Sequence, residues 1–373
     1  MARMKTAAFA IVLVGACHRA PDAPSASSAA PAPVAPAPVA AAAPARDADE
    51  PPHAKTSTAA DEQGLDLAMT VFEGTKVEKN ETAWPNGNKQ RIAWSERGKN
   101  GRPVDHGPDW RWFENGQLEL KRVWRHGKQD GPFEEWHEGG FQKASGAFAQ
   151  DEKDGRWITW HESGVPQSER TWKRGKLDGR AREWFENGAK KSEQGWKDGL
   201  AEGVFLLWKP NGTKSQEGAF AAGKKFGEWR EWYADGREWY HGFFADGRET
   251  GTWKWLDLQN RRIEEDYREG LLEGVRRTWN PEGVLIEEGT YKAGKADGLQ
   301  RTWWPSGKIL SEIEYRAGKP NGASRYFFES GIVQMEGEMV DGKRTGTWTY
   351  KKEDGSVDPQ WSGRYEDDRR VGP

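Results

Sequence analysis

The ten residues Gly227-Glu228-Trp229-Arg230-Glu231-Trp232-Tyr233-Ala234-Asp235-Gly236 contain the pattern that decides the fold. A short run that mixes aromatic and polar residues leads into Asp235-Gly236, a dipeptide typical of tight hairpin turns because both residues accept positive φ. The first glycine of this run recurs at a period of 24 residues along most of the chain. A fixed period of this length indicates a repeat architecture rather than ordinary globular domains.

We call the recurring glycine position 1 and number each unit from it. The interval is 24 residues except between Gly251 and Gly274, where it is 23. The series is Gly107, Gly131, Gly155, Gly179, Gly203, Gly227, Gly251, Gly274, Gly298, Gly322 and Gly346.

Two aromatic columns follow from this numbering. Position 6 gives a candidate structural or binding column, Trp112, Trp136, Trp160, Trp184, Trp208, Trp232, Trp279 and Trp303. Position 18 is also mostly aromatic, from Trp124 and Phe148 to Tyr365. The position 6 rings are either the hydrophobic spine of a thin sheet or a platform that stacks on sugar rings. Whether the two columns share a face depends on the register, because a slip of one residue moves a strand's side chains to the other face.

Each unit is interpreted as strand, tight turn, strand and glycine loop. Asn115-Gly116 and Asn187-Gly188 predict two-residue type I′ hairpin turns. Leu65, Leu67, Met69 and Val71 alternate with polar or small residues and predict a strand before the first unit. The predicted fold is all-β, an elongated antiparallel single-sheet meander of about eleven to twelve β-hairpin repeats.

The amino terminus is typical of an exported protein. Arg3 and Lys5 precede an apolar run, Ala7 to Ala16, which is too short to cross a bilayer as a helix. The run ends in Val14-Gly15-Ala16-Cys17, which resembles the lipobox of bacterial lipoproteins. The resemblance implies cleavage before Cys17 and acylation of this residue, which is the only cysteine. Lipid on Cys17 would then attach the protein to a membrane.

These observations divide the chain into three parts. Residues 1–16 are predicted to be a lipoprotein signal peptide, and residues 65–373 the repeat array. Residues 17–64 are rich in alanine and proline, as in Pro31-Ala32-Pro33, and predict a disordered tether with an extended character.

Composition excludes several classes of function. The net charge is −3, so no overall attraction to nucleic acid is expected. His137 and His161 share position 7 but lie one unit apart, too far for a common zinc ion without a recurring third ligand. No nucleophile–base set is recognisable, and we expect no enzyme activity, no cofactor and no metal.

The run from Gly227 to Gly236, followed by Phe244 and Gly247, resembles the bacterial variant of the MORN (membrane occupation and recognition nexus) repeat. The resemblance covers roughly residues 65–373. It implies a scaffold or a membrane-associated recognition surface. Proteins with this pattern are often grouped by name with the YwqK-like antitoxins.

The sequence therefore predicts a membrane-tethered, non-catalytic repeat scaffold that mediates protein interaction in the cell envelope. The alternatives are a glycan- or peptidoglycan-binding surface that uses the tryptophan rows, and an antitoxin-like inhibitor of a partner toxin. The expected partners are the membrane, through Cys17, and a protein, with polysaccharide as the alternative and nucleic acid excluded. The expected location is outside the cytoplasm, with the outer membrane preferred over the inner.

Overall fold

The computed structural model describes residues 52–56 and 65–373. The predicted signal peptide, Cys17 as the predicted acylation site, and most of the predicted tether lie outside these ranges. The described residues form strands, turns and loops, with no helix. None of them therefore forms an apolar helix of membrane-spanning length.

The strands are β1 (Val71–Phe72), β2 (Thr75–Lys76), β3 (Glu78–Ala83), β4 (Lys89–Arg97), β5 (Pro103–Trp112), β6 (Leu118–Arg125), β7 (Lys128–Trp136), β8 (Gln142–Ala149), β9 (Glu152–Trp160), β10 (Pro166–Lys173), β11 (Lys176–Trp184), β12 (Lys190–Lys197), β13 (Leu200–Trp208), β14 (Lys214–Ala221), β15 (Lys224–Trp232), β16 (Glu238–Ala245), β17 (Arg248–Leu256), β18 (Arg262–Arg268), β19 (Leu271–Trp279), β20 (Leu285–Lys292), β21 (Lys295–Trp303), β22 (Ile309–Arg316), β23 (Lys319–Phe327), β24 (Val333–Val340), β25 (Lys343–Tyr350), β26 (Gly363–Glu366) and β27 (Arg369–Gly372).

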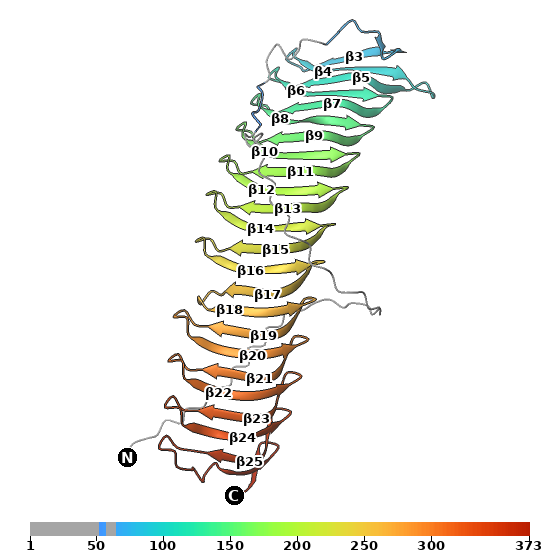
Figure 1. Ribbon diagram of the computed structural model, residues 1–373. Helices are drawn as coiled ribbons and strands as arrows, with labels where there is room; N and C mark the ends of the chain where they lie inside the picture. Colours follow the sequence, from blue (N-terminus) through green and yellow to red (C-terminus); the bar gives the residue numbers. More distant parts are fainter. Residues whose placement is uncertain (1–51, 57–64) are drawn as a thin grey trace. The chain divides into compact units, whose positions relative to one another are not determined.

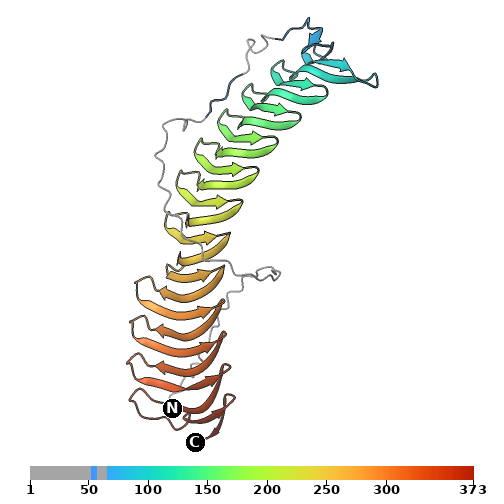
Figure 2. The same ribbon diagram turned by 45° about the vertical axis from the view of Figure 1, so that its right-hand side comes forward.

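From β3 to β27 every strand pairs antiparallel with the next strand in the chain. The result is one open meander in which β3 and β25 lie at opposite ends of the array (Figure 1). A turned view shows a single layer whose strands bend along their length (Figure 2). The predicted all-β, single-sheet repeat fold is confirmed.

One turn of each unit is a two-residue type I′ turn. Arg125 pairs with Lys128, which leaves His126 and Gly127 as the loop. Their φ angles are 49° and 82°, both in the left-handed region that a type I′ turn requires. In several units the glycine of this turn is followed by lysine, as in Gly127-Lys128. The sequence predicted only a glycine loop at this place.

The Asn-Gly turns are of another type, and their predicted assignment as type I′ is wrong. Gly116 has a φ of +85°, but Asn115 has no positive φ. Phe113 N donates to Gln117 O at 2.9 Å, and Gly116 N donates to Phe113 O at 3.0 Å. This is a three-residue loop, a type I turn followed by a glycine bulge. The Asn115 carboxamide oxygen accepts the Gln117 N–H at 2.9 Å, which holds asparagine in the right-handed region.

The type I′ turns stack on one another along one edge of the sheet. The second turn residue donates its N–H to a carbonyl of the preceding unit, as Gly175 does to Lys153 O at 3.0 Å. Gly199 bonds to Leu177 O and Gly223 to Ala201 O in the same way, both at 2.8 Å. The constant period of the sequence keeps these donors and acceptors in line.

The interval of 23 residues has a structural counterpart. Strands β17 and β18 pair from Leu256–Arg262 onward without the register shift found at the equivalent place in the other hairpins. Asn260 takes the place of the loop glycine with a φ of +59°. The three-residue loop is kept, since Asp257 N donates to Arg261 O at 3.1 Å. The residue that is lost is the extra one that shifts the register after this loop in the other hairpins.

The alternating segment before the first unit is not the predicted strand. Asp66 folds it into a turn, because Asp66 O accepts the Met69 N–H at 3.1 Å and Asp66 Oδ1 accepts the Ala68 N–H at 3.0 Å. Leu65 and Met69 pack on the cluster of buried residues that includes Trp94 and Trp112. The Trp94 indole donates to Met69 O at 3.1 Å. The segment thus covers the first end of the sheet instead of extending it.

The type I′ turns predict a large difference between two glycine substitutions. Gly199 has a φ of +85°, so Gly199→Ala should lower the unfolding free energy by about 1–2 kcal/mol. Gly139 has no positive φ and no atom within 4 Å of the place that a Cβ would take, so Gly139→Ala should change it by less than about 0.5 kcal/mol. Urea unfolding of both variants measures the difference, and equal losses would contradict the turn assignment.

Candidate functional site

The sheet has two faces, which cross-strand pairs define. Phe133 pairs with Gly146, and Gly131 with Phe148, so positions 3 and 18 share what we call the aromatic face. Trp136 pairs with Gln142 on the opposite face. The question that the sequence left open is thus answered: positions 6 and 18 lie on different faces.

A ring–glycine contact recurs on the aromatic face. The position 3 ring of one unit lies over the position 16 glycine of the preceding unit, as Trp229 lies over Gly218. The Trp229 indole donates to Ala219 O at 3.1 Å, and Trp157 donates to Ala147 O at 2.9 Å. The contact is found at Trp157 with Gly146, Trp229 with Gly218, Trp253 with Gly242 and Trp348 with Gly337. A Cβ on any of these glycines would overlap the tryptophan ring.

One unit without a position 3 tryptophan keeps part of this contact. Gln300 replaces the ring above Gly289, and its amide donates to Thr290 O at 2.8 Å, in the place of the indole N–H.

Asp109 at position 3 is fully buried and accepts from Arg91 at 2.7 Å and Arg122 at 2.9 Å. Burial alone would raise the pKa of Asp109, but these two guanidinium groups outweigh it and lower that pKa below its ordinary value.

Position 18 rings complete the aromatic face. Phe220 and Phe244 stand edge-on to Trp229 at centroid distances of 5.2 and 5.9 Å. Lys225 lies over Trp229 at 4.2 Å, and burial lowers the pKa of its ammonium group. Lys153 covers Trp157 in the same way, also at 4.2 Å. These rings are covered by neighbours and are not available for stacking on a ligand.

The position 6 tryptophans lie on the opposite face and differ in burial along the array. Trp112, Trp136, Trp160 and Trp184 are only 2–4% exposed. Trp208, Trp232, Trp279 and Trp303 are half-buried. Lys121 lies over both Trp110 and Trp136, which places these rings on one face. No member of the column is fully exposed.

Position 7 side chains join successive units. His137 Nε2 lies 3.1 Å from Trp160 O, and the Tyr233 hydroxyl donates to Leu256 O at 2.5 Å. His161 Nε2 is buried and has no hydrogen-bond partner among the described residues. His137 therefore has a structural contact, and no described side chain completes a metal site around the pair.

A hollow of about 850 Å³ opens on the aromatic face between β7 and β10. Its floor includes the small cross-strand pair Ala144 and Thr159, whereas Tyr240 and Trp255 fill the equivalent positions further along the sheet. Trp157 and His161 also line it. The small side chains of Ala144 and Thr159 account for the hollow, and Trp157 in its wall is covered by Lys153.

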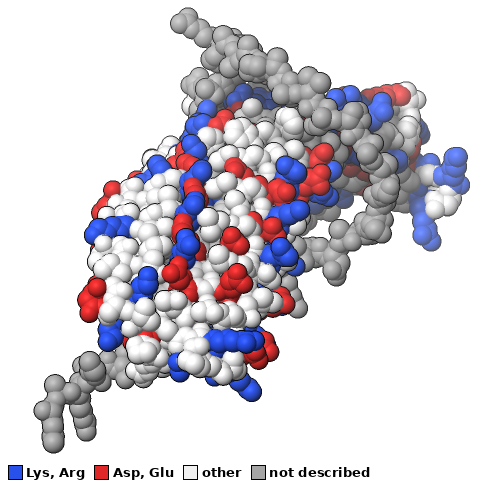
Figure 3. Space-filling view, turned by 60° about the horizontal axis from the view of Figure 1, so that its bottom comes forward, with Lys and Arg blue, Asp and Glu red and all other residues white. Residues whose placement is uncertain are grey.

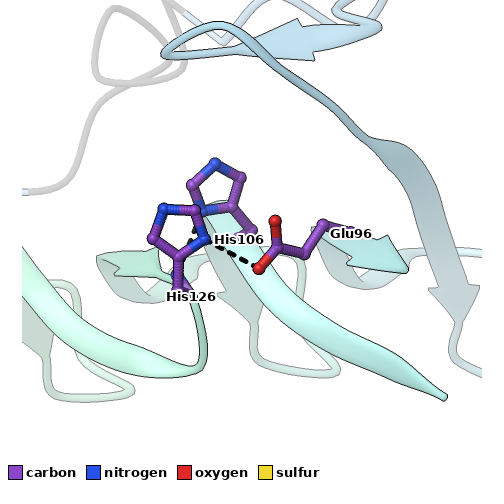
Figure 4. A group of neighbouring side chains, drawn as sticks. All are labelled: Glu96, His106 and His126. Atoms are coloured by element: carbon purple, nitrogen blue, oxygen red, sulfur yellow. Dashed lines mark hydrogen bonds and ion pairs between the residues drawn. The ribbon is translucent and has the colours of Figure 1, made fainter. Parts of the chain in front are cut away.

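Sequence reasoning did not single out Glu96, His106 and His126, which meet at the first end of the array (Figure 4). His126 Nδ1 lies 2.8 Å from Glu96 Oε1. The buried His106 uses both ring nitrogens: Nδ1 accepts the His126 N–H at 3.1 Å, and Nε2 lies 3.3 Å from Phe72 O.

This trio does not fit a metal as it stands. The two imidazole rings are stacked at 4.3 Å with an interplanar angle of 20°. A metal ion lies in the plane of each imidazole that binds it, and two nearly parallel planes do not meet at a common ion. The arrangement instead joins the β1–β2 hairpin to β4, β5 and the β6–β7 turn.

Comparison with known families identifies part of the array. Residues 153–174, 272–293 and 296–317 match the family described as MORN repeat variant. Three segments of this chain are therefore similar to MORN repeat variants. Each matched segment spans one hairpin with its three-residue loop, β9–β10, β19–β20 and β21–β22. No match to a curated protein was found.

Among solved structures, the crystal structure of TcdB2-TccC3-Cdc42 is similar at 10% identity over 74% of this chain and 18% of that chain, with a TM-score of 0.16. TcdB2-TccC3 without its hypervariable C-terminal region gives 10% identity, 76% and 17% coverage, and a TM-score of 0.17. The structure of the Photorhabdus luminescens Tc holotoxin pore is similar at 12% identity over 76% of this chain and 17% of that chain, with a TM-score of 0.13. This chain spans less than a fifth of their length, and such scores establish no common fold.

The ring–glycine contact predicts a graded effect of adding one methyl group. Gly218→Ala should lower the unfolding free energy by about 2 kcal/mol, because the Trp229 ring cannot move away without losing its neighbours. Gly289→Ala should cost less than about 1 kcal/mol, since the end of the flexible Gln300 side chain can swing aside. Urea midpoints test the order of the two variants. A Gly289→Ala loss as large as that of Gly218→Ala would contradict it.

Proposed function

We propose that this chain is a non-catalytic scaffold that binds protein partners through the opposite face of its repeat array and is held at a cell-envelope membrane by lipid on Cys17. MORN repeats support a scaffold for interaction. The observation that carries the proposal is an exposed apolar patch at the middle of the array, which we call the central patch: Val204, Phe226 and Phe243.

The central patch lies on neighbouring strands of one face. Val204 pairs with Ala219, Ala219 pairs with Phe226, and Phe243 follows on β16 beside Glu228. The three apolar side chains are 57%, 45% and 42% exposed. Large apolar side chains exposed close together on one face favour an interaction surface.

Mixed charge surrounds this patch. Beside it, Arg230 pairs with Glu228 at 2.6 Å on β15, and Lys214 pairs with Glu217 at 2.7 Å on β14. The space-filling view shows Lys and Arg interleaved with Asp and Glu on the face in view (Figure 3). An apolar centre with a polar rim is the anatomy of protein interfaces, whereas nucleic acid requires a basic surface.

Burial of the tryptophan columns argues against the glycan alternative. A ring that stacks on a sugar must expose a face, but Trp229 and Trp253 are 1% exposed. The position 6 rings are buried or half-buried. Binding of a toxin, as the antitoxin-like grouping implies, would be one form of protein binding by the central patch.

Two adjacent phenylalanines provide a matched test. Phe243 is exposed on the opposite face, while Phe244 is buried on the aromatic face. Phe243→Ser should abolish capture of protein partners from envelope extract and change stability by less than about 1 kcal/mol. Phe244→Ser should destabilise by about 3–5 kcal/mol. Unchanged capture by Phe243→Ser, or capture of polysaccharide alone, would refute the proposed function.

The membrane tether has a separate test. Metabolic labelling with a fatty acid should mark the wild-type chain and leave Cys17→Ser unlabelled, because acylation needs the thiol. Equal label in both proteins would exclude Cys17 as the attachment site.

A further inference from the structure

A short amino-terminal segment, Pro52–Thr56, lies against a part of the array that is far from it in sequence. The Trp160 indole donates to Pro52 O at 2.9 Å, and Gln142 N donates to Lys55 O at 2.9 Å. Thr56 forms an antiparallel bridge with Phe141. In Figure 1 the segment lies beside the loops that precede β8 and β10. The array therefore holds an extended peptide through the carbonyl oxygens of that peptide.

Burial along the segment alternates as in a bound strand. Pro52 and Ala54 are half-buried, whereas His53 and Lys55 are exposed. An extended chain directs alternate side chains to the same side, so small apolar residues face the array and polar residues face solvent. This alternation gives side-chain selectivity to peptides that bind as added strands.

The array side of the contact is a built site. Gln142 is 2% exposed and Trp160 is 4% exposed, and each donates one hydrogen bond to the segment. Trp136, one unit away, is 3% exposed, and its indole N–H has no partner among the described residues. A buried donor without a partner is uncommon, which suggests that a longer occupant would reach Trp136 as well.

The donors and acceptors define the chemistry of the occupant. The hydrogen bonds from Trp160 and Gln142 both end on peptide carbonyls, so an occupant needs no N–H at those residues. Proline supplies a carbonyl without an N–H and favours the extended backbone. Docking of proline-containing segments against aromatic side chains is a recurring form of recognition.

We propose that Trp136, Phe141, Gln142 and Trp160 form a binding site for an extended peptide with proline or alanine at alternate positions, and that Pro52–Thr56 occupy it in cis. Only eight residues separate Thr56 from Leu65, where the described chain resumes. Such a short connection gives an effective concentration on the order of millimolar. A partner peptide must therefore displace the segment.

The test uses the full chain with residues 51–56 replaced by Gly-Ser-Gly-Ser-Gly-Ser. The probe is a fluorescent peptide with the sequence of residues 47–60, and binding is followed by fluorescence anisotropy. The replaced chain should bind the probe saturably, and the wild type about tenfold more weakly because its own segment competes. Absence of binding to the replaced chain, or equal affinity for both chains, would overturn the proposal.

Variants in the replaced chain test the individual hydrogen bonds. Gln142→Pro removes the N–H that serves Lys55 O, and Pro166 occupies the same position in the next unit, so the fold accepts proline there. Trp160→Phe removes the indole donor, and Trp232→Phe is its control at the same position further along the array. Gln142→Pro and Trp160→Phe should each weaken probe binding about fivefold, whereas Trp232→Phe should leave it unchanged.

Two further outcomes would refute the assignment. The first is equal binding by Trp160→Phe and Trp232→Phe, provided that their unfolding midpoints are also equal. The second is a wild-type dimer in sedimentation that is lost on replacement of residues 51–56, which would place the segment on a second copy rather than in cis.

Discussion

The array depends on a recurring contact in which a position 3 tryptophan, Trp157, Trp229, Trp253 or Trp348, lies over the position 16 glycine of the unit before it. In a single layer no second sheet covers the side chains, so burial must come from neighbours within the layer. The missing Cβ of Gly218 lets Trp229 lie flat on the backbone, where its indole N–H reaches Ala219 O at 3.1 Å. One contact thereby buries a large ring, satisfies its polar atom and joins two hairpins.

The remaining features follow from the need to repeat this contact. Type I′ turns hydrogen-bond from unit to unit along one edge, and position 7 side chains join the units along the other. The ring–glycine contacts lie on the aromatic face, and the opposite face presents the central patch and the charged pairs. Each unit touches mainly its neighbours, so stability is expected to be a sum of local terms while the binding surface extends with the array.

The sequence predicted the repeat, the all-β sheet and the hairpin unit, because period and turn residues are local signals. It missed the position 3 column, which Ala181, Arg276 and Ser324 interrupt, although tryptophan there accompanies glycine at position 16. Bulges after Asn115 and its equivalents alter the register and hide which columns share a face. The cap formed by Leu65 and Met69, and the docking of Pro52–Thr56 on Trp160, are long-range contacts that no local pattern encodes.

Residue-resolved hydrogen exchange on Trp229→Ala tests the central claim most directly. If the ring joins only adjacent units, amide protection should fall in β13 to β17 and stay at the wild-type level in β5–β8 and β21–β25. A uniform loss of protection along the sheet, or no loss around β15, would contradict an array held together by nearest-neighbour ring–glycine contacts.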